Sequence, residues 1–212
     1  MKALIVIFFI YAGRGEAYCL PPTSSSIKSN SVINAAMVES AANEFSDVAK
    51  NLLPAGEKLT ITFEALNPGV NAEIIKSGAG PVIKVLGGML KHPNMNKTAL
   101  SLLLCHELGH YLGGPPLKSR NGWSSTEGQA DYYSGETCAR YLGLSEENLV
   151  DGALNLTRIY SEVTLESPPV LESCDETRVT RTHYGYPKIQ CRLDTIIAGW
   201  KNERRPECWF FE

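Results

Sequence analysis

The sequence lacks the features that define several large functional classes. After its first residues it has no apolar run approaching the ~18 residues of a membrane-spanning helix, so we expect no stable membrane span in the mature chain. It has no GxSxG segment of a serine hydrolase and no glycine fingerprint of a nucleotide-binding loop. Its net charge of −3 gives no basic excess, so we expect no nucleic-acid partner.

The first residues, MKALIVIFFIYAGRGEAYC, have the features of a secretory signal peptide. Lys2 precedes an apolar run over residues 3–12, and Gly15 and Ala17 place small residues at the −3 and −1 positions of a cleavage site. A membrane anchor is the weaker interpretation, because this run spans only about half of a ~30 Å bilayer core. We predict a signal peptide at 1–17, a linker at 18–30 and a single domain at 31–212, in a secreted or periplasmic protein.

Cysteine is more frequent than is usual for a cytosolic chain of this length, and the number is even. The six residues form no CxxC pair and no zinc-finger spacing, so in an exported protein they favour disulfides, with up to three bridges and 15 pairings. They are Cys19, Cys105, Cys138, Cys174, Cys191 and Cys208. Cys105 is the strongest candidate for a free thiol, because it lies in an apolar helical segment.

The spacing of apolar residues predicts an α+β fold, with a small mixed or antiparallel sheet packed on a buried helix and a mainly helical C-terminal part. The segment 97–112 is apolar almost all round, which is typical of a buried helix. Ser124 is a plausible N-cap for the next helix. The expected strands are 57–66, 70–76 and 81–87, the expected helices are 33–53, 97–112, 125–142, 145–164 and 188–201, and residues 166–187 are expected to form a loop.

The buried helix carries an HExxH motif, from His106 through Glu107 to His110. Residues i and i+4 lie on one helical face, so both imidazoles can bind one metal ion, and Glu107 can reach a water on that metal. Two of the four histidines of the chain fall in this motif. Two satisfied core histidines are the alternative, but a buried HExxH without a metal would leave polar groups without partners.

A catalytic zinc needs a third protein ligand and an open fourth position. The third histidine of the metzincins is absent, because that position is Pro116. Glu127 and Asp131 offer two carboxylates at i and i+4 on one face of the next predicted helix. The alternatives are that Glu127 closes a capping box with Ser124 and that Asp131 is a solvated helix charge.

HELGH followed by EGQAD resembles the gluzincin pattern, and most closely the metallopeptidase family of the prenyl-protein endoprotease and the membrane heat-shock protease, with its small secreted bacterial relatives. The resemblance covers residues 80–142. It implies a zincin-like fold and a Zn²⁺ site with His106, His110 and Glu127 as ligands. It also implies that Asp131 orients a ligand imidazole, with Asp131 itself as the second candidate for the third ligand.

That family often carries His-Pro, four residues and then Arg near the zinc. The matching frame here runs from Tyr186-Pro187 to Arg192, with His183 three residues before Tyr186. The resemblance therefore offers His183 and Tyr186 as alternative donors to the developing oxyanion, with Arg192 close to the site, and ordinary loop residues are the other interpretation of the first two. It also implies that residues 81–87 are an edge strand along which substrate lies.

The function that follows is a secreted zinc metalloendopeptidase, which hydrolyses peptide bonds through a zinc-activated water with Glu107 as general base. Its partners would be a peptide or protein substrate and a protein inhibitor, because the linker at 18–30 is too short for a folded prodomain. The alternative is a non-catalytic secreted protein, stapled by disulfides, that binds zinc or another protein. A structural zinc site would usually have four protein ligands.

Overall fold

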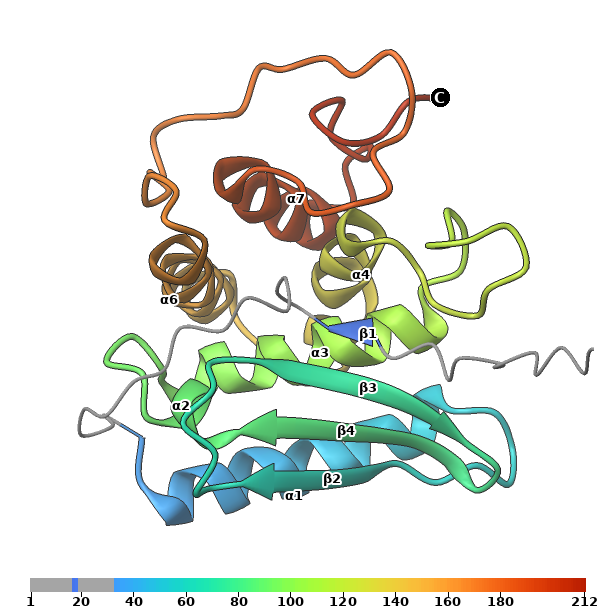
Figure 1. The fold of residues 1–212 in the computed structure, drawn as a ribbon, viewed down its shortest axis with the longest axis vertical. Helices are drawn as coiled ribbons and strands as arrows, with labels where there is room; N and C mark the ends of the chain where they lie inside the picture. The colour runs from blue at the N-terminus through green and yellow to red at the C-terminus, as the bar shows by residue number, and fades with distance from the viewer. Residues whose placement is uncertain (1–16, 19–32) are drawn as a thin grey trace, which may run out of the picture.

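The chain folds as a small mixed sheet with helices, in the computed structural model that describes residues 17–18 and 33–212. The rest of the predicted signal peptide and linker lies outside the described residues. Figure 1 shows α1 and α3 behind the sheet, with α4, α6 and α7 on the other side of α3. The elements are β1 (Ala17–Tyr18), α1 (Ala35–Leu52), β2 (Thr60–Glu64), β3 (Ala72–Ser77), β4 (Gly80–Leu86), α2 (Gly87–Leu90), α3 (Lys97–Leu112), α4 (Glu127–Tyr133), a π-helical turn (Ser134–Cys138), α5 (Ala139–Tyr141), α6 (Glu146–Thr164) and α7 (Ile189–Lys201).

The strands are ordered β1-β3-β4-β2. β4 pairs antiparallel with β3 and parallel with β2, and the short β1 pairs antiparallel with the outer side of β3. The expectation that residues 81–87 form an edge strand is therefore wrong, because β4 has a neighbour on each side. The strand whose outer side lies beside α3 is β3, and β1 runs along it there (Figure 1).

Helix α3 is the centre of the molecule. Asn96 caps it by accepting a hydrogen bond from the backbone of Ala99 at 2.8 Å, and every residue from Ala99 to His110 is buried. The sheet and α1 cover one side of the helix, and α6 and α4 cover the other (Figure 1). Because α3 is enclosed by these elements, its polar residues lie in a water-poor environment where they need specific partners.

Helix α4 begins later than the sequence suggests. Thr126, and not Ser124, is the N-cap, and its side chain accepts from the backbone of Gln129. The predicted helix over 125–142 is divided into α4, the π-helical turn and α5. Glu127 is thus the first residue of α4, with its side chain 1% exposed, so it is not the capping-box partner of Ser124.

Two disulfides join helices and loops around α3 and α7. Cys105 bonds to Cys138, and Cys191 bonds to Cys208, while Cys174 is an exposed free thiol. The expectation of a free thiol at Cys105 is wrong, because the π-helical turn brings Cys138 against this face of α3. Cys19 lies outside the described residues.

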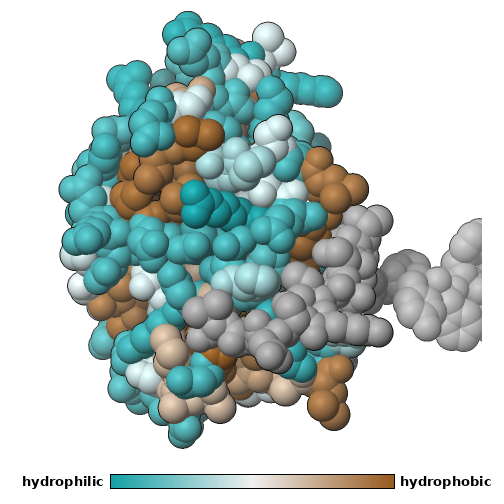
Figure 2. All heavy atoms as spheres, turned by 90° about the vertical axis from the view of Figure 1, so that its left-hand side faces the viewer, coloured by the Kyte–Doolittle hydropathy of each residue, from teal (hydrophilic) through white to brown (hydrophobic). Residues whose placement is uncertain are grey.

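The surface is mainly hydrophilic on the face drawn in Figure 2, where apolar side chains form separate patches. In the described part of the chain, no helix combines the length and the apolar character needed to cross a membrane.

Close packing of α3 on α4 requires glycine inside the HExxH motif. A Cβ at Gly109 would lie 2.7 Å from the backbone oxygen and 2.9 Å from the Cα of Ala130. We expect Gly109→Ala to lower the free energy of unfolding by about 1–3 kcal/mol, because the helices must separate. Gly78→Ala, where a Cβ meets nothing within 4 Å, is the control and should change it by less than ~0.5 kcal/mol. Equal effects in urea unfolding would contradict the packing argument.

Peptide mapping without reduction should recover the Cys105–Cys138 and Cys191–Cys208 pairs. Replacing both Cys105 and Cys138 by alanine should lower the free energy of unfolding by about 2–4 kcal/mol, because the unfolded chain loses a cross-link. Recovery of a different pairing from the native protein would show that the π-helical turn does not pack on α3 as described.

Candidate metal centre

Two imidazoles on one face of α3 form the base of the site. His106 and His110 are fully buried, and their ring centroids lie 4.6 Å apart. Nδ1 of His110 lies 2.8 Å from the backbone oxygen of Ser125, so a proton on this nitrogen would donate to that oxygen. This contact leaves Nε2 of His110 free to point away from the loop as a lone-pair donor.

The carboxylate of Glu127 faces both imidazoles from the start of α4. Its Oε2 lies 3.3 Å from Nε2 of His106, and its Oε1 lies 3.6 Å from Nε2 of His110. Two ligand atoms bound to a tetrahedral Zn²⁺ at about 2.0–2.1 Å lie about 3.3 Å from each other. The two distances from the Glu127 carboxylate to the imidazole nitrogens are thus close to this ligand-to-ligand spacing.

The donor atoms also have the burial expected of metal ligands. One ligand atom from each of these three residues can be chosen so that all lie within 4.8 Å of one another. Nε2 of both histidines and Oε2 of Glu127 are buried without a hydrogen bond in the described part of the chain. Buried polar atoms without hydrogen bonds are costly, and a shared cation would satisfy all of them. The residues present thus fit a divalent metal with nitrogen and oxygen ligands.

Asp131 contacts the opposite side of the first imidazole. Its Oδ1 lies 2.7 Å from Nδ1 of His106, on the ring nitrogen that faces away from Glu127. Arg192 holds the same carboxylate in a bidentate pair, with Nε donating to Oδ2 at 2.8 Å and Nη2 donating to Oδ1 at 3.0 Å. Asp131 is therefore placed to orient His106 and not to join the three ligand atoms.

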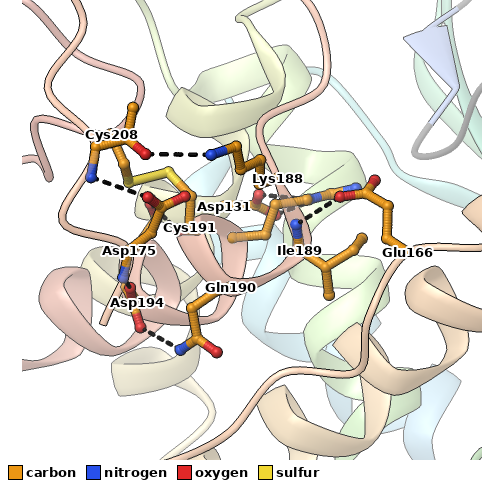
Figure 3. The surroundings of a disulfide bond; sticks show 12 residues. Asp131, Glu166, Asp175, Lys188, Ile189, Gln190, Cys191, Asp194 and Cys208 are labelled. Atoms are coloured by element: carbon orange, nitrogen blue, oxygen red, sulfur yellow. Dashed lines mark hydrogen bonds and ion pairs between the residues drawn. A yellow bond between two sulfur atoms is a disulfide. The ribbon is translucent and has the colours of Figure 1, made fainter. Parts of the chain in front are cut away.

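Arg192 is itself fixed by its surroundings. Its guanidinium lies over the ring of Tyr160 at 4.1 Å from the centroid, and its Nη2 lies 3.7 Å from Oε2 of Glu127. The preceding residue, Cys191, is tied to the C-terminal segment by its disulfide (Figure 3). The bridge and the cation–π contact together limit the movement of the residue that holds Asp131.

The pKa values follow from this arrangement. Burial by itself would lower the pKa of His106, but the Asp131 carboxylate outweighs it and raises that pKa to about 9. Burial dominates at His110 and lowers its pKa to about 3, against the opposing effect of Glu127. Burial would raise the pKa of Glu127, yet His110 and Lys118 bring it below its ordinary value. Near pH 7 and without a metal, Glu127 is therefore ionised, His110 neutral and His106 protonated, so that metal binding at His106 must release a proton.

The other predicted site residues lie in two places. Glu107 is fully buried on α3 directly after His106. His183 and Tyr186 lie in the loop before α7, where His183 is exposed and its backbone donates to the oxygen of Trp209 at 2.7 Å. In the described part of the chain the side chain of His183 makes no hydrogen bond or ion pair with His106, His110 or Glu127. The role of either residue as an oxyanion donor stays a prediction.

Two contacts at the site were not predicted from the sequence. Nζ of Lys118 donates to Oε1 of Glu127 at 2.6 Å, and Ser125 positions His110 through its backbone oxygen. Both residues come from the irregular loop between α3 and α4, and no spacing rule marks them. A second group of metal-binding residue types, Asp175 with Cys191 and Cys208, offers no thiolates because its two sulfurs are bonded to each other.

The buried pair of Asp131 and Arg192 gives a stability test. Asp131→Ala should lower the free energy of unfolding by about 3–5 kcal/mol in the presence of a chelator, because it leaves a buried guanidinium without its main partner. Arg192→Met in the same chain should restore part of that loss. Asp47→Ala removes a surface partner of Lys50, both side chains being 74% exposed, and should cost less than ~1 kcal/mol. If the Asp131 and Asp47 variants unfold alike in denaturant, the buried pair does not hold the site.

The chain matches no known family model, no curated protein and no solved structure. Its likeness to zinc peptidases therefore rests on the motifs of the sequence. The structure adds a second observation, the short distances between the side chains of His106, His110 and Glu127.

Proposed function

We propose that the chain is a zinc-dependent peptidase with a zincin-like fold. The observation that carries the proposal is the buried cluster of His106, His110 and Glu127, one ligand atom of each lying within 4.8 Å of the others. Three protein ligands of these types are those of a catalytic zinc site, in which the fourth position is left for water or substrate. Support for the fold comes from the order of elements: a small sheet, a helix that supplies both histidines, and a following helix that supplies the glutamate.

Zinc bound by these three residues would polarise a peptide carbonyl and acidify a bound water. Asp131 and Arg192 would orient the metal-binding side chains. The Asp131 carboxylate, 2.7 Å from Nδ1 of His106, would hold the proton on that nitrogen and turn the Nε2 lone pair toward the metal position. Arg192 keeps the Asp131 carboxylate ionised and oriented, so that a strong hydrogen-bond acceptor stays behind the ligand.

Glu107 is the proposed general base. Its place directly after a ligand on α3 is the place in which the carboxylate of an HExxH motif can accept a proton from the attacking water. The same carboxyl group can then deliver this proton to the nitrogen of the departing amine. Its complete burial excludes bulk water, which strengthens electrostatic interactions in the site.

The outer side of β3 is the proposed docking edge for an extended substrate. β1 already pairs there, with Ala17 opposite Ile74 and Tyr18 opposite Glu73, next to α3. This pairing supports the idea that an antiparallel strand fits beside α3. Backbone hydrogen bonds would bind a peptide there largely independently of its sequence. Such an edge favours a peptide or protein substrate over a compact small molecule.

The disulfides bear on the alternative of a non-catalytic zinc protein. A structural zinc site usually has four protein ligands, and Cys105, next to His106 on α3, cannot supply a fourth. Its sulfur is bonded to Cys138, which favours an open coordination position. Two disulfides in one small chain are typical of an oxidising compartment, and this supports the proposed export by a signal peptide.

Zinc content and peptide cleavage test the proposal. Purified wild type should contain about one zinc per chain by atomic spectroscopy, and Glu127→Ala should lose it, because two imidazoles alone hold zinc weakly. Asp131→Ala should bind zinc about 10- to 100-fold more weakly. Glu107→Gln should keep zinc but lower the rate of peptide cleavage by about 10²- to 10⁴-fold. Glu44→Gln, whose exposed carboxylate pairs with Lys97 at the start of α3, is the matched control and should keep both properties.

The outcomes separate the alternatives. If Glu127→Ala keeps zinc and Asp131→Ala loses it, then Asp131 is the third ligand and Glu127 is not. A wild type that holds zinc but cleaves no peptide library would favour the non-catalytic protein, and a wild type without zinc would contradict the peptidase.

A further inference from the structure

Lys118 lies in the loop that connects the two metal-binding helices. The loop is anchored to α3, since the backbone of Ser125 donates to the oxygen of His110 at 2.9 Å. The backbone of Lys118 donates to the oxygen of Ser124 at 2.8 Å, and a bridge joins the next pair, Leu117 and Ser125. The backbone of Lys118 is therefore held by the same loop that positions His110.

The two oxygens of Glu127 have parallel surroundings. Oε2 lies 3.3 Å from Nε2 of His106 and 3.7 Å from Nη2 of Arg192. Oε1 lies 3.6 Å from Nε2 of His110 and 2.6 Å from Nζ of Lys118. Each oxygen that could bind a metal thus has one imidazole and one permanent cation beside it, and the ammonium is the closest of the four groups.

The two cations differ in their freedom to move. Arg192 is 1% exposed and is held by Asp131 and Tyr160. The side chain of Lys118 is 27% exposed, and Glu127 is its one ion-pair partner in the described part of the chain. Lysine also has a flexible four-carbon stem. Lys118 can therefore leave Glu127 for solvent without breaking any other ion pair, whereas Arg192 cannot.

We propose that Lys118 is a positioning residue that competes with the metal for Oε1 of Glu127 and so sets the metal affinity of the site. The proposal rests on the proposed function, because it takes Glu127 as a ligand. A divalent ion at this oxygen would meet an ammonium already bonded to it, and two cations on one oxygen repel each other. Binding of the metal therefore requires the ammonium to leave, and the lost charge-assisted hydrogen bond weakens the measured affinity.

The same contact stabilises Glu127 when the metal is removed. A buried carboxylate without a partner is costly, and Lys118 supplies a charge that keeps it ionised and directed at the histidines. Lys118 thus has opposite effects on the chelator-treated protein, which it stabilises, and on the metal complex, which it weakens. A residue with a purely structural role would not produce this pair of opposite effects.

Lys118→Met tests the proposal, because methionine keeps much of the length and removes the charge. The zinc dissociation constant, measured by competition with a chelating dye at fixed pH and ionic strength, should fall by about 10- to 100-fold. The melting temperature of the chelator-treated variant should fall below that of wild type. Lys118→Arg should keep the wild-type dissociation constant within about threefold, since it retains a cation. Lys97→Met removes a lysine paired with Glu44 between α3 and α1, and should leave the zinc dissociation constant unchanged.

An unchanged or larger dissociation constant in Lys118→Met would overturn the proposal. If that variant does not fold, Lys118→Gln gives the same test with a polar side chain. Zinc binding by Lys118→Met but not by wild type would support competition at Glu127 while contradicting the peptidase. A wild type that binds zinc and cleaves peptides, with a Lys118→Met variant of equal affinity, would overturn the role of Lys118 while leaving the peptidase intact. If neither wild type nor Lys118→Met binds zinc, both the role of Lys118 and the peptidase proposal are overturned.

Discussion

The buried carboxylate of Asp131 is the group on which the arrangement of the site depends. It joins Arg192 of α7 to His106 of α3, so one side chain fixes the relative position of two helices that are far apart in the sequence. A carboxylate in this position must be paired, because its burial without partners would cost several kcal/mol. With both partners in place it can orient an imidazole, and the imidazole then presents its other nitrogen to Glu127.

The rest of the fold protects this alignment. Gly109 lets α4 approach α3 closely enough for the Glu127 carboxylate to reach both histidines. Each disulfide begins at a residue next to the site, since Cys105 precedes His106 and Cys191 precedes Arg192. Such bridges restrict the unfolded chain and so stabilise the folded domain. Three kinds of constraint thus fix the site: the packing of α3 on α4, the two disulfides, and the loop that carries Lys118.

Local sequence signals predicted the parts of the structure that depend on neighbouring residues. The bounds of α3 follow from an apolar run between Asn96 and a glycine–proline segment, and the HExxH spacing placed two imidazoles together. Apart from the N-cap of α4 and the interruption of the helix that follows it, the errors concern contacts between distant segments. Strand order decides which strand lies at an edge, so β4 could not be placed from its own residues. Likewise, the disulfide of Cys105 depends on the π-helical turn, which brings Cys138 back to α3. The contact of Lys118 with Glu127 depends on the path of the loop between α3 and α4.

The central claim is that one metal is bound by two imidazoles and a carboxylate between α3 and α4, with no sulfur ligand. X-ray absorption spectroscopy of the zinc-loaded protein tests it most directly. The account predicts nitrogen and oxygen neighbours at about 2.0–2.1 Å, with outer-shell scattering from two imidazoles and an oxygen ligand from water. A zinc–sulfur distance of about 2.3 Å, or the scattering of more than two imidazoles, would contradict it.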